Sequence, residues 1–492
     1  RSGWEAASGT TESTNAHYRG FPSGEFHSLN YAAEVYKKPT RTENTTRRVS
    51  VLASANYTWN DIYLVDASVR FDGSSEFGAN QKWAPFFSGG LGVNIHNYDF
   101  FKSNGYINKL KLRASYGRTG KVNFPAYAAT TMYETLFDEW YITGYGAVLK
   151  ALGNKDLTWE KTDKLSVGIE TKTFHDRLTV DFEYYYNKTI DLVNDVTLSQ
   201  TSGFSTYKDN MGQVANKGVE LKLRADIYRD RNWDVALWGN MAHNKNEILK
   251  ISDSQKAYNE RVAAYYKNEA LYQETLGLSH SAEYSVPLPQ YEEGASLTSI
   301  WAVRSLGIDP TTGKEIFLNR DGSIADKWNA AQEVVVGNTE PKCSGAFGLN
   351  LSYKNWTLFA SFLYEWGGQE YNQTLVNNVE NADLVNKNVD LRVLTDRWKK
   401  PGDIAQFKDI KDRGMTTLPT SRFVQDKALV RLNSLNVSYD FNRDWIKKHL
   451  RMNLLRLEAS TSDLINWSSI KQERGLSYPR SWKVEFSLKA QF

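Results

Sequence analysis

Residues 218–228 read GVELKLRADIY, and their side chains alternate between apolar and polar along the whole segment. Successive side chains of a β-strand point to opposite faces, so one face is apolar and the other carries Glu220, Lys222, Arg224 and Asp226. Packing such a face against a second sheet costs several kcal/mol for each unpaired ion. The polar face must therefore meet water, and we predict that the opposite face meets a hydrophobic medium.

The same alternation recurs along most of the chain. It places Lys109, Lys111 and Arg113 on the polar face of one segment, and Asp181 and Glu183 on that of another. A strand that crosses an outer membrane needs only about 9–11 residues. The pattern predicts thirteen strands of suitable length, at 48–58, 62–71, 83–96, 108–117, 163–173, 177–187, 214–227, 233–243, 344–353, 356–366, 427–441, 451–460 and 480–492.

The connections between these strands alternate without exception between short and long. The largest are 118–162, 244–343 and 367–426, and they are separated by connections as short as 354–355. Outer-membrane barrels have tight periplasmic turns and long extracellular loops, whereas a sandwich has no reason to gather its long loops at one end. Tryptophans near strand ends, such as Trp233 and Trp356, fit the aromatic girdles of such barrels. We therefore predict an all-β, transmembrane antiparallel β-barrel.

The composition excludes several other classes of protein. The chain has 492 residues, a formal net charge of +3 and a single cysteine, Cys343. One thiol excludes a disulfide scaffold, and balanced charge argues against a nucleic-acid partner. No apolar run is long enough for a transmembrane helix, and residues 1–20 lack the apolar core of a signal peptide. Within the longest connection, 254–276 reads as a helix, and 381–399 is predicted to be helical as well.

An odd number of strands raises a question of parity. Both ends of a bacterial barrel normally face the periplasm, which requires an even number. Counting back from 480–492, the first strand descends and residues 1–47 form an extracellular loop region. Two interpretations remain: a strand has been missed, with 26–38 (FHSLNYAAEVYKK) as the candidate, or the chain is the later part of a larger barrel. We favour the second.

Nine stretches resemble the SusC/RagA family of TonB-dependent outer-membrane transporters. They are FDGSSEFG (71–78), LKLRASYGRTG (110–120), DLTWEKTDKLSVGIE (156–170), NKGVELKL (216–223), SLGIDPTTGKEIF (305–317), EWGGQEYN (365–372), RWKKPGD (397–403), RFVQDKALVRLNSLNVSYDF (422–441) and SYPRSWKVEFSLKAQF (477–492). Each stretch is weakly specific, but nine in order are a strong signal.

The resemblance implies a barrel of 22 strands in the outer membrane of a Gram-negative bacterium, with 48–492 as its C-terminal part. It also implies a plug domain, which this chain lacks, through which the TonB complex acts. The remaining N-terminal strands, the lipid bilayer and a SusD-like surface lipoprotein are the other partners that it implies.

The loop 132–145 (MYETLFDEWYITGY) is the candidate for substrate binding. Aromatic faces beside carboxylates suit sugar rings or peptide backbones, and packing within the loop is an equally good interpretation. The candidate residues are Tyr133, Trp140, Tyr141, Tyr145 and Asp138.

We predict no catalytic residue, metal site or cofactor. The histidines are scattered, and Asp309 begins an Asx-Pro turn that lacks the last ligand of a calcium loop. Asp181 and Glu183 lie about 6.6 Å apart along their strand at roughly 3.3 Å per residue, a spacing that suits a glycosidase. The similar mixed charges of 218–228 favour lumen lining instead. The lumen-facing set is therefore Lys109, Lys111, Arg113, Asp181, Glu183, Glu220, Lys222, Arg224 and Asp226.

The function predicted from these observations is TonB-dependent import of a nutrient oligomer, glycan or oligopeptide, by a protein that is not an enzyme. The loops carry no readable code for the cargo. Two alternatives remain open at this point: a secreted β-sandwich that binds or hydrolyses glycans, and a passive porin.

Overall fold

The structure is a computed structural model that describes residues 1–492 except 22–31, 103–105, 123, 125, 143, 198–205, 211, 277–281, 385–388 and 471–482. Its main feature is one antiparallel sheet of fifteen described strands, which pair in sequence order. They are β1 (Ser2–Arg19), β2 (Glu34–Trp59), β3 (Tyr63–Ser74), β4 (Trp83–Asn94), β5 (Ile107–Lys121), β8 (Glu160–Thr173), β9 (Leu178–Ile190), β12 (Gln213–Arg229), β13 (Trp233–Lys250), β19 (Cys343–Tyr353), β20 (Trp356–Tyr371), β21 (Val424–Asp440), β22 (Leu454–Ser462), β23 (Asn466–Ser468) and β24 (Lys483–Gln491). Both β22 and β23 pair with β21, at different heights.

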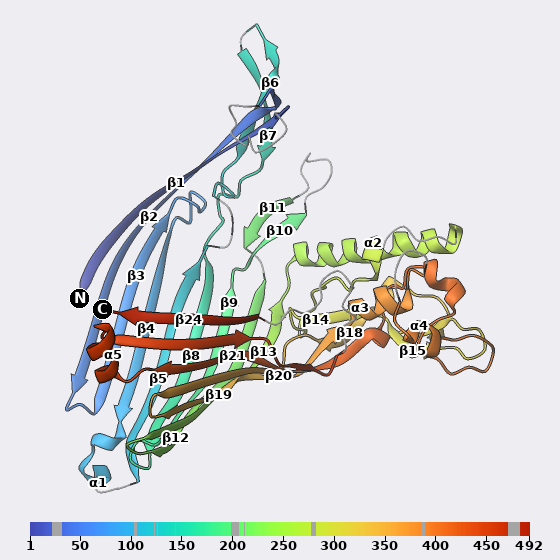
Figure 1. The fold of residues 1–492 in the computed structure, drawn as a ribbon. Helices are drawn as coiled ribbons and strands as arrows, with labels where there is room; N and C mark the ends of the chain where they lie inside the picture. The colour runs from blue at the N-terminus through green and yellow to red at the C-terminus, as the bar shows by residue number, and fades with distance from the viewer. Residues whose placement is uncertain are drawn as a thin grey trace.

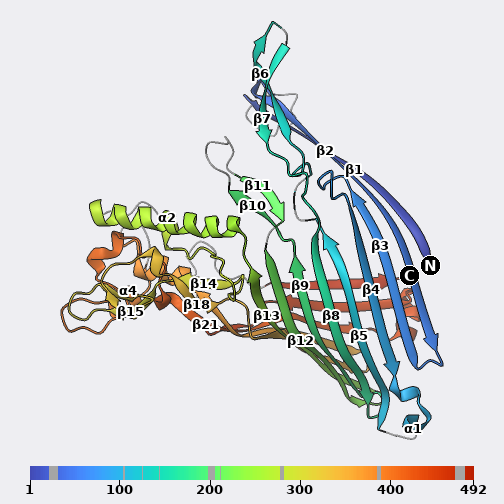
Figure 2. The same cartoon turned by 180° about the vertical axis from the view of Figure 1, so that it is seen from behind.

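The sheet is strongly curved, so that its two ends approach each other (Figures 1 and 2). The first strand β1 and the last strand β24 are not hydrogen-bonded to each other in the described sheet. A single sheet of this size excludes the sandwich, which needs two stacked sheets. The prediction of an all-β barrel architecture is confirmed, and each of the thirteen predicted strands has its counterpart.

The parity argument missed one strand. Residues 1–47 were expected to form a loop region, but β1 pairs with β2 from Ser2↔Ala53 to Arg19↔Glu34. That expectation is wrong for Ser2–Arg19, and the hidden strand is not the candidate 26–38, part of which lies outside the described residues. Strand β1 is rich in Ser, Thr and Asn on both faces, so it lacks the alternation that identifies a half-buried strand. Backbone pairing with β2 stabilises β1 instead.

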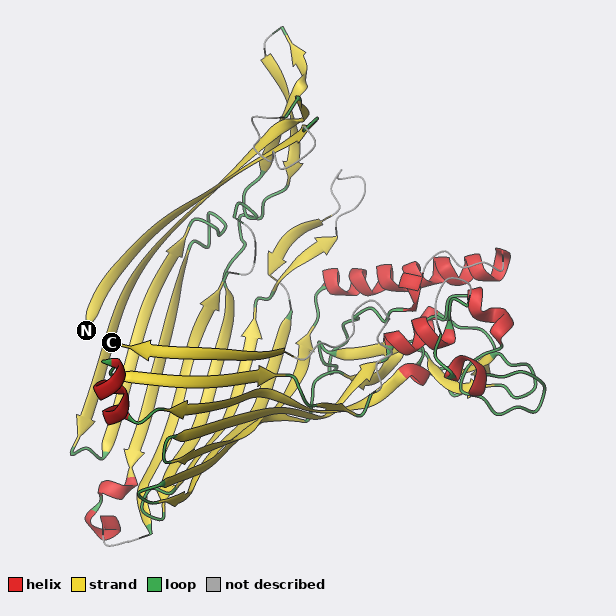
Figure 3. Cartoon of the chain, viewed as in Figure 1, coloured by secondary structure: helices red, strands yellow, loops and turns green. Residues whose placement is uncertain are grey.

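Short connections and long connections leave opposite edges of the sheet (Figure 3). The turn between β2 and β3 holds Asn60 and Asp61 at φ of 51° and 56°, the left-handed geometry of a tight hairpin turn. At the same edge the short helices α1 (Asp99–Lys102) and α5 (Arg443–Leu450) join neighbouring strands.

The long connections carry secondary structure of their own. Their strands form two hairpins and two small sheets: β6 (Met132–Tyr141) with β7 (Gly144–Ala151), β10 (Val193–Thr197) with β11 (Thr206–Asn210), β14 (Ser299–Ala302) with β18 (Val334–Asn338), and β15 (Arg304–Ile308), β16 (Glu315–Leu318) and β17 (Ile324–Ala325) together. Their helices are α2 (Asp253–Leu276), α3 (Gln373–Leu375) and α4 (Arg392–Thr395), with single turns at Ala282–Ser285, Ala330–Gln332, Val376–Glu380, Ile410–Gly414 and Ser421–Phe423.

The predicted helix over 254–276 is confirmed as α2. Ser252 and Gln255 exchange hydrogen bonds at its start, from Gln255 N to Ser252 Oγ (3.2 Å) and from Ser252 N to Gln255 Oε1 (2.9 Å), which forms a capping box. The predicted helix over 381–399 is wrong, because α4 is the only α-helix among the described residues there. Arg397 instead forms a β-bridge with Phe407. None of the described helices is both long and apolar enough to cross a bilayer.

Among the residues that the structure describes, three apolar clusters stabilise the long connections. One joins Phe77 to Trp159, whose rings stack at 4.2 Å between centroids. The second surrounds Val376 and Phe423, and the third packs Tyr266 of α2 against Leu418. The last two clusters lie in the compact region formed by α2 and the small sheets beside the barrel mouth (Figure 1), which we name the α2 region and define as residues 251–342 and 372–423.

Candidate functional site: the polar face of the sheet

The predicted polar residues gather on one face of the sheet. Glu220 lies between Glu183 of β9 and Ala242 of β13, and Lys222 lies between Asp181 and Asn240. The opposite face exposes large apolar side chains, among them Leu91 (62% exposed), Leu223 (42%) and Phe486 (76%). Exposed apolar surface on this scale marks contact with lipid or a partner, and an apolar outer band is the signature of an outer-membrane barrel.

Ion pairs link the charged side chains of the polar face across strands. The Arg113 guanidinium on β5 donates to Asp181 Oδ1 at 2.8 Å and to Glu183 Oε2 at 2.7 Å, both on β9. Between them lies β8, where a Cβ on Gly168 would approach Arg113 Nε to 2.8 Å. Because Gly168 has no side chain, the side chain of Arg113 can cross β8 to reach β9.

Other predicted residues are paired in the same way or left free. Lys109 Nζ donates to Glu170 Oε1 at 2.6 Å, and Arg224 lies 3.1 Å from Asp226. Lys222 forms no ion pair within the described part of the chain. The carboxylates with glycosidase-like spacing, Asp181 and Glu183, share one guanidinium, as expected of an ion-paired wall.

A cluster of amides and hydroxyls lies toward the edge from which the long connections leave. Tyr185 Oη donates to Asn244 Oδ1 at 2.9 Å, and Asn244 Nδ2 donates to Asn216 Oδ1 at 3.2 Å. Beside them is a cavity of about 570 Å³, which Ser115, Lys164, Ser166 and Glu220 also line. Neutral donors and acceptors in such density suit a polar oligomer. The alternation along each strand predicts which face these residues lie on. It does not predict that they contact one another.

The loop aromatics occupy the β6–β7 hairpin, which projects from the sheet beside the outer ends of β1 and β2 (Figures 1 and 2). Tyr133 is 71% exposed near the base of this hairpin. Trp140 pairs with Tyr145, and Tyr141 with Gly144, at its tip. The side chains of Asp138, Trp140, Tyr141 and Tyr145 lie outside what the structure describes, so their role in binding stays a prediction.

The α2 region is held together by a buried ion-pair cluster. Arg422 donates to Glu315 Oε2 at 2.9 Å and to Glu380 Oε1 at 2.6 Å. Burial alone would raise the pKa of Glu315, but the charge and hydrogen bond of Arg422 outweigh it and hold the pKa below its usual value. Burial also lowers the pKa of Lys408 to about 8, although the charge of Glu380 opposes this shift.

A second buried arginine caps several backbone carbonyls in the same region. The Arg397 guanidinium donates to the carbonyls of Val379, Glu380, Val393 and Lys408. Its neighbour Trp398 donates from Nε1 to Pro310 O at 2.8 Å. Gly313, at φ +74°, leaves room for that indole, since a Cβ there would lie 2.5 Å from its ring. These contacts explain why RWKKPGD and SLGIDPTTGKEIF, distant in sequence, form one unit.

The residues that the structure describes contain no group of three or more His, Cys, Asp or Glu side chains that could hold a metal ion. Asp309 accepts hydrogen bonds from Thr311 N and Thr312 Oγ1, both at 2.8 Å. This is the Asx turn expected from the sequence.

The chain is similar in sequence to known proteins. Residues 3–454 match the family described as TonB dependent receptor-like, beta-barrel. The TonB-dependent receptor P39 of Formosa agariphila is 27% identical over 96% of this chain and 49% of its own length. The TonB-dependent receptor SusC of Bacteroides thetaiotaomicron is 24% identical over 88% of this chain and 42% of its own. The chain thus spans about half the length of the curated relatives it matches.

Solved structures agree on the fold. The structure of the RagAB peptide importer in its closed-closed state superposes with a TM-score of 0.81 at 23% identity, covering 100% of this chain and 53% of that one. The open-open state of the same importer gives the same TM-score. At this level of identity the likeness shows the fold alone.

Proposed function

This chain belongs to the TonB-dependent receptor-like β-barrel family, and from that premise we propose that it is part of an outer-membrane importer of a nutrient oligomer, glycan or oligopeptide. The family consists of transporters of the outer membrane, and we propose transport without catalysis. The polar face of the sheet lines the lumen, and the apolar face meets lipid.

The observation that carries this proposal is the contrast between the two faces. Cross-strand ion pairs such as Arg113 with Asp181 and Glu183 satisfy the charges on one face. The other face leaves Leu91 and Phe486 mostly exposed. A water-filled interior and a hydrocarbon exterior account for both the paired charges and the exposed apolar side chains. The charged side chains are then hydrated, and the apolar ones contact lipid.

We propose that the cargo is captured at the edge with the long connections. The exposed Tyr133 on the β6–β7 hairpin and the amides around Asn244 offer contacts for a polar oligomer. The α2 region is a large and internally bonded platform on which a SusD-like surface lipoprotein would dock. The energised step belongs to a plug domain coupled to TonB, in the part of the relatives that this chain does not span.

Uptake by living cells tests the proposal. Cells that lack the receptor gene are supplied with a labelled oligosaccharide mixture or a labelled oligopeptide mixture, and uptake is compared with that of cells carrying the gene. We expect loss of uptake for one of the two mixtures, and the same loss when TonB is removed. A passive porin would take up its cargo without TonB, and that outcome contradicts the proposal.

A further inference from the structure

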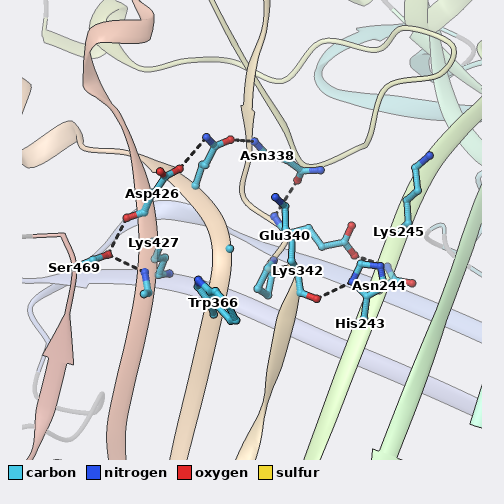
Figure 4. A pocket seen from close by; sticks show the side chains of 14 residues that line it. His243, Asn244, Lys245, Asn338, Glu340, Lys342, Trp366, Asp426, Lys427 and Ser469 are labelled. Atoms are coloured by element: carbon cyan, nitrogen blue, oxygen red, sulfur yellow. Dashed lines mark hydrogen bonds between the residues drawn. The ribbon is translucent and has the colours of Figure 1, made fainter.

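A second cavity, of about 560 Å³, opens on the apolar face of the sheet near the edge with the long connections. It spans the ends of β13, β20 and β21 and the segment that enters β19. Figure 4 shows Trp366, Lys342 and His243 along one side of it, and Asp426 and Asn338 along the other. Asn244 lines both this cavity and the cavity on the polar face described above.

The strand register fixes the face on which this cavity opens. Trp366 pairs with Cys343 on one side and with Ala428 on the other. Four residues away on the same strand, Phe362 stacks on Phe347 at 5.2 Å between ring centroids. Since alternate residues share a face, Trp366 continues this apolar band and is 70% exposed. The cavity therefore sits directly above the band that meets hydrocarbon, at the level of lipid headgroups.

A β-bulge shapes the cavity. The register of β20 with β21 shifts between Trp366 and Gly368, and Gly367 adopts φ +79°. A Cβ at Gly367 would lie 2.9 Å from Lys342 Cβ, so glycine lets the alkyl stem of Lys342 lie against the strand. The stem lies against the bulge, and Lys342 is one of the residues that line the cavity.

The cationic groups of the cavity are neutralised to different degrees. Lys427 Nζ lies 3.3 Å from Glu370 and 3.5 Å from Glu365, so it is paired. No carboxylate in the described part of the chain lies within ion-pair distance of Lys342. Lys245 is 60% exposed and has Glu247 at 3.4 Å. His243 Nδ1–H donates to the Lys342 carbonyl at 2.7 Å, which leaves Nε2 for another partner.

Hydrogen-bonding groups form the opposite side. Asn338 and Gln369 lie there with Asp426, whose Oδ1 accepts from Gln369 Nε2 at 3.1 Å. The carboxylate of Glu340 accepts from Asn244 Nδ2 and from the backbone N–H of Asn246, so it is turned toward β13. Amide and carboxylate groups of this kind bind sugar hydroxyls, and ammonium groups bind phosphate.

We propose that this cavity binds the phosphorylated sugar headgroup of a glycolipid from the outer leaflet of the membrane. Lys245 and Lys342 contact its phosphate, the Asn338 and Gln369 side meets its sugar hydroxyls, and Trp366 packs against the first carbons of its acyl chains. The occupant is a lipid because the cavity opens at the headgroup level of the lipid-facing wall, beside an exposed aromatic side chain.

The test uses the full-length receptor in detergent and lipid A carrying both phosphates, with native mass spectrometry to count bound lipid. We expect K245E/K342E to weaken binding by roughly tenfold or more, the loss expected for charge-assisted hydrogen bonds. K354E changes a lysine in the β19–β20 turn at the opposite edge of the sheet, and it should bind as the unchanged protein does. If the K245E/K342E variant does not fold, the K245Q/K342Q variant replaces it in the test, because it removes both charges with little change in side-chain volume.

Two further probes identify the source of the phosphate. Lipid A stripped of both phosphates should bind the unchanged receptor as weakly as intact lipid A binds K245E/K342E. Inorganic phosphate at the same molar concentration should not displace bound lipid. Four outcomes would each overturn the proposal. The stripped lipid binds as well as intact lipid A, or inorganic phosphate displaces the lipid fully. Alternatively, K245E/K342E binds as the unchanged protein does, or it changes the oligomeric state without changing lipid binding.

Discussion

Arg113 of β5 donates to Glu183 of β9 at 2.7 Å although strand β8 lies between them. The guanidinium reaches that far because Gly168 has no side chain. A single cation thereby joins β5 to β9 across β8, and it neutralises the adjacent carboxylate of Asp181 as well. We regard this bridge as the element that fixes the spacing of charges on the proposed lumen wall.

Replacement of Arg113 by Met should destabilise the folded barrel by about 2 kcal/mol, because Asp181 and Glu183 then repel each other without a counterion. Adding D181N and E183Q should recover most of the loss. The measurement is the temperature at which the folded band is lost on gel electrophoresis of unheated and heated samples. K222M is the matched control, since Lys222 has no ion pair among the described residues, and a loss equal to that of R113M would contradict the bridge.

Only part of this wall was predictable from the sequence. The alternation in 218–228 assigns Lys222 and Leu223 to opposite faces without further information, because strand geometry has period 2. The partner of Arg113 depends on which strands are neighbours and on their register, which no single segment encodes. The role of Gly168 is visible only when all three strands are in place.

The two clearest errors have the same physical origin. Strand β1 is held by pairing with β2 and has no continuous apolar face, so a search for alternation passes over it. The predicted helix over 381–399 ends after one turn because Arg397 and Trp398 bond to residues 310 and 408 instead. Tertiary contacts override local propensity in both cases.

The assignment of faces is tested directly by L223R. A cation at mid-depth on the lipid face should cost roughly 2–4 kcal/mol, so the folded fraction recovered from outer membranes should fall. K222L on the neighbouring position should leave that fraction nearly unchanged. Equal tolerance of the two substitutions would show that the apolar face does not meet lipid.

The connection between β3 and β4 should depend on Gly78. Its N–H donates to Leu157 O at 3.0 Å, and a Cβ would lie 2.0 Å from Lys155 O, a backbone atom that cannot step aside. G78A should therefore separate 75–82 from 153–157 at a cost of about 1–3 kcal/mol. Faster cleavage of 122–159 by protease added to whole cells is the expected result. G89A, where the nearest atom is 3.9 Å away, should cleave at the original rate.

The α2 region should collapse independently of the barrel when Arg422 is lost. R422M leaves the carboxylates of Glu315 and Glu380 buried without a counterion, which typically costs about 3–5 kcal/mol. Protease should then cut within 251–342 on whole cells while the barrel remains in the membrane. The triple variant R422M/E315Q/E380Q should be more resistant than R422M alone; if it is cut as readily, charge burial is not the cause.

The stability of the α2 region should decrease as pH rises from about 4.5 to 7 because of Glu333. Burial raises the pKa of this carboxyl to about 7, although the side-chain hydrogen bond from Gln290 opposes the shift. An acid with a raised pKa holds its proton in the folded state and loses it in the unfolded state between pH 4.5 and 7, so folding is progressively disfavoured over that window. The full effect over this window, at about 1.36 kcal/mol per pH unit, is slightly more than 3 kcal/mol.

Hydrogen exchange of the amides of 330–338 in the intact receptor measures this effect. After correction for the intrinsic pH dependence of exchange, opening of this segment should become easier from pH 5 to pH 8. E333Q keeps the shape and a neutral head at every pH, so its opening should not change across that window. Arg320, whose guanidinium donates to the Glu333 carbonyl at 3.1 Å, stays in place in both proteins. A pH dependence that persists in E333Q would assign it to another group.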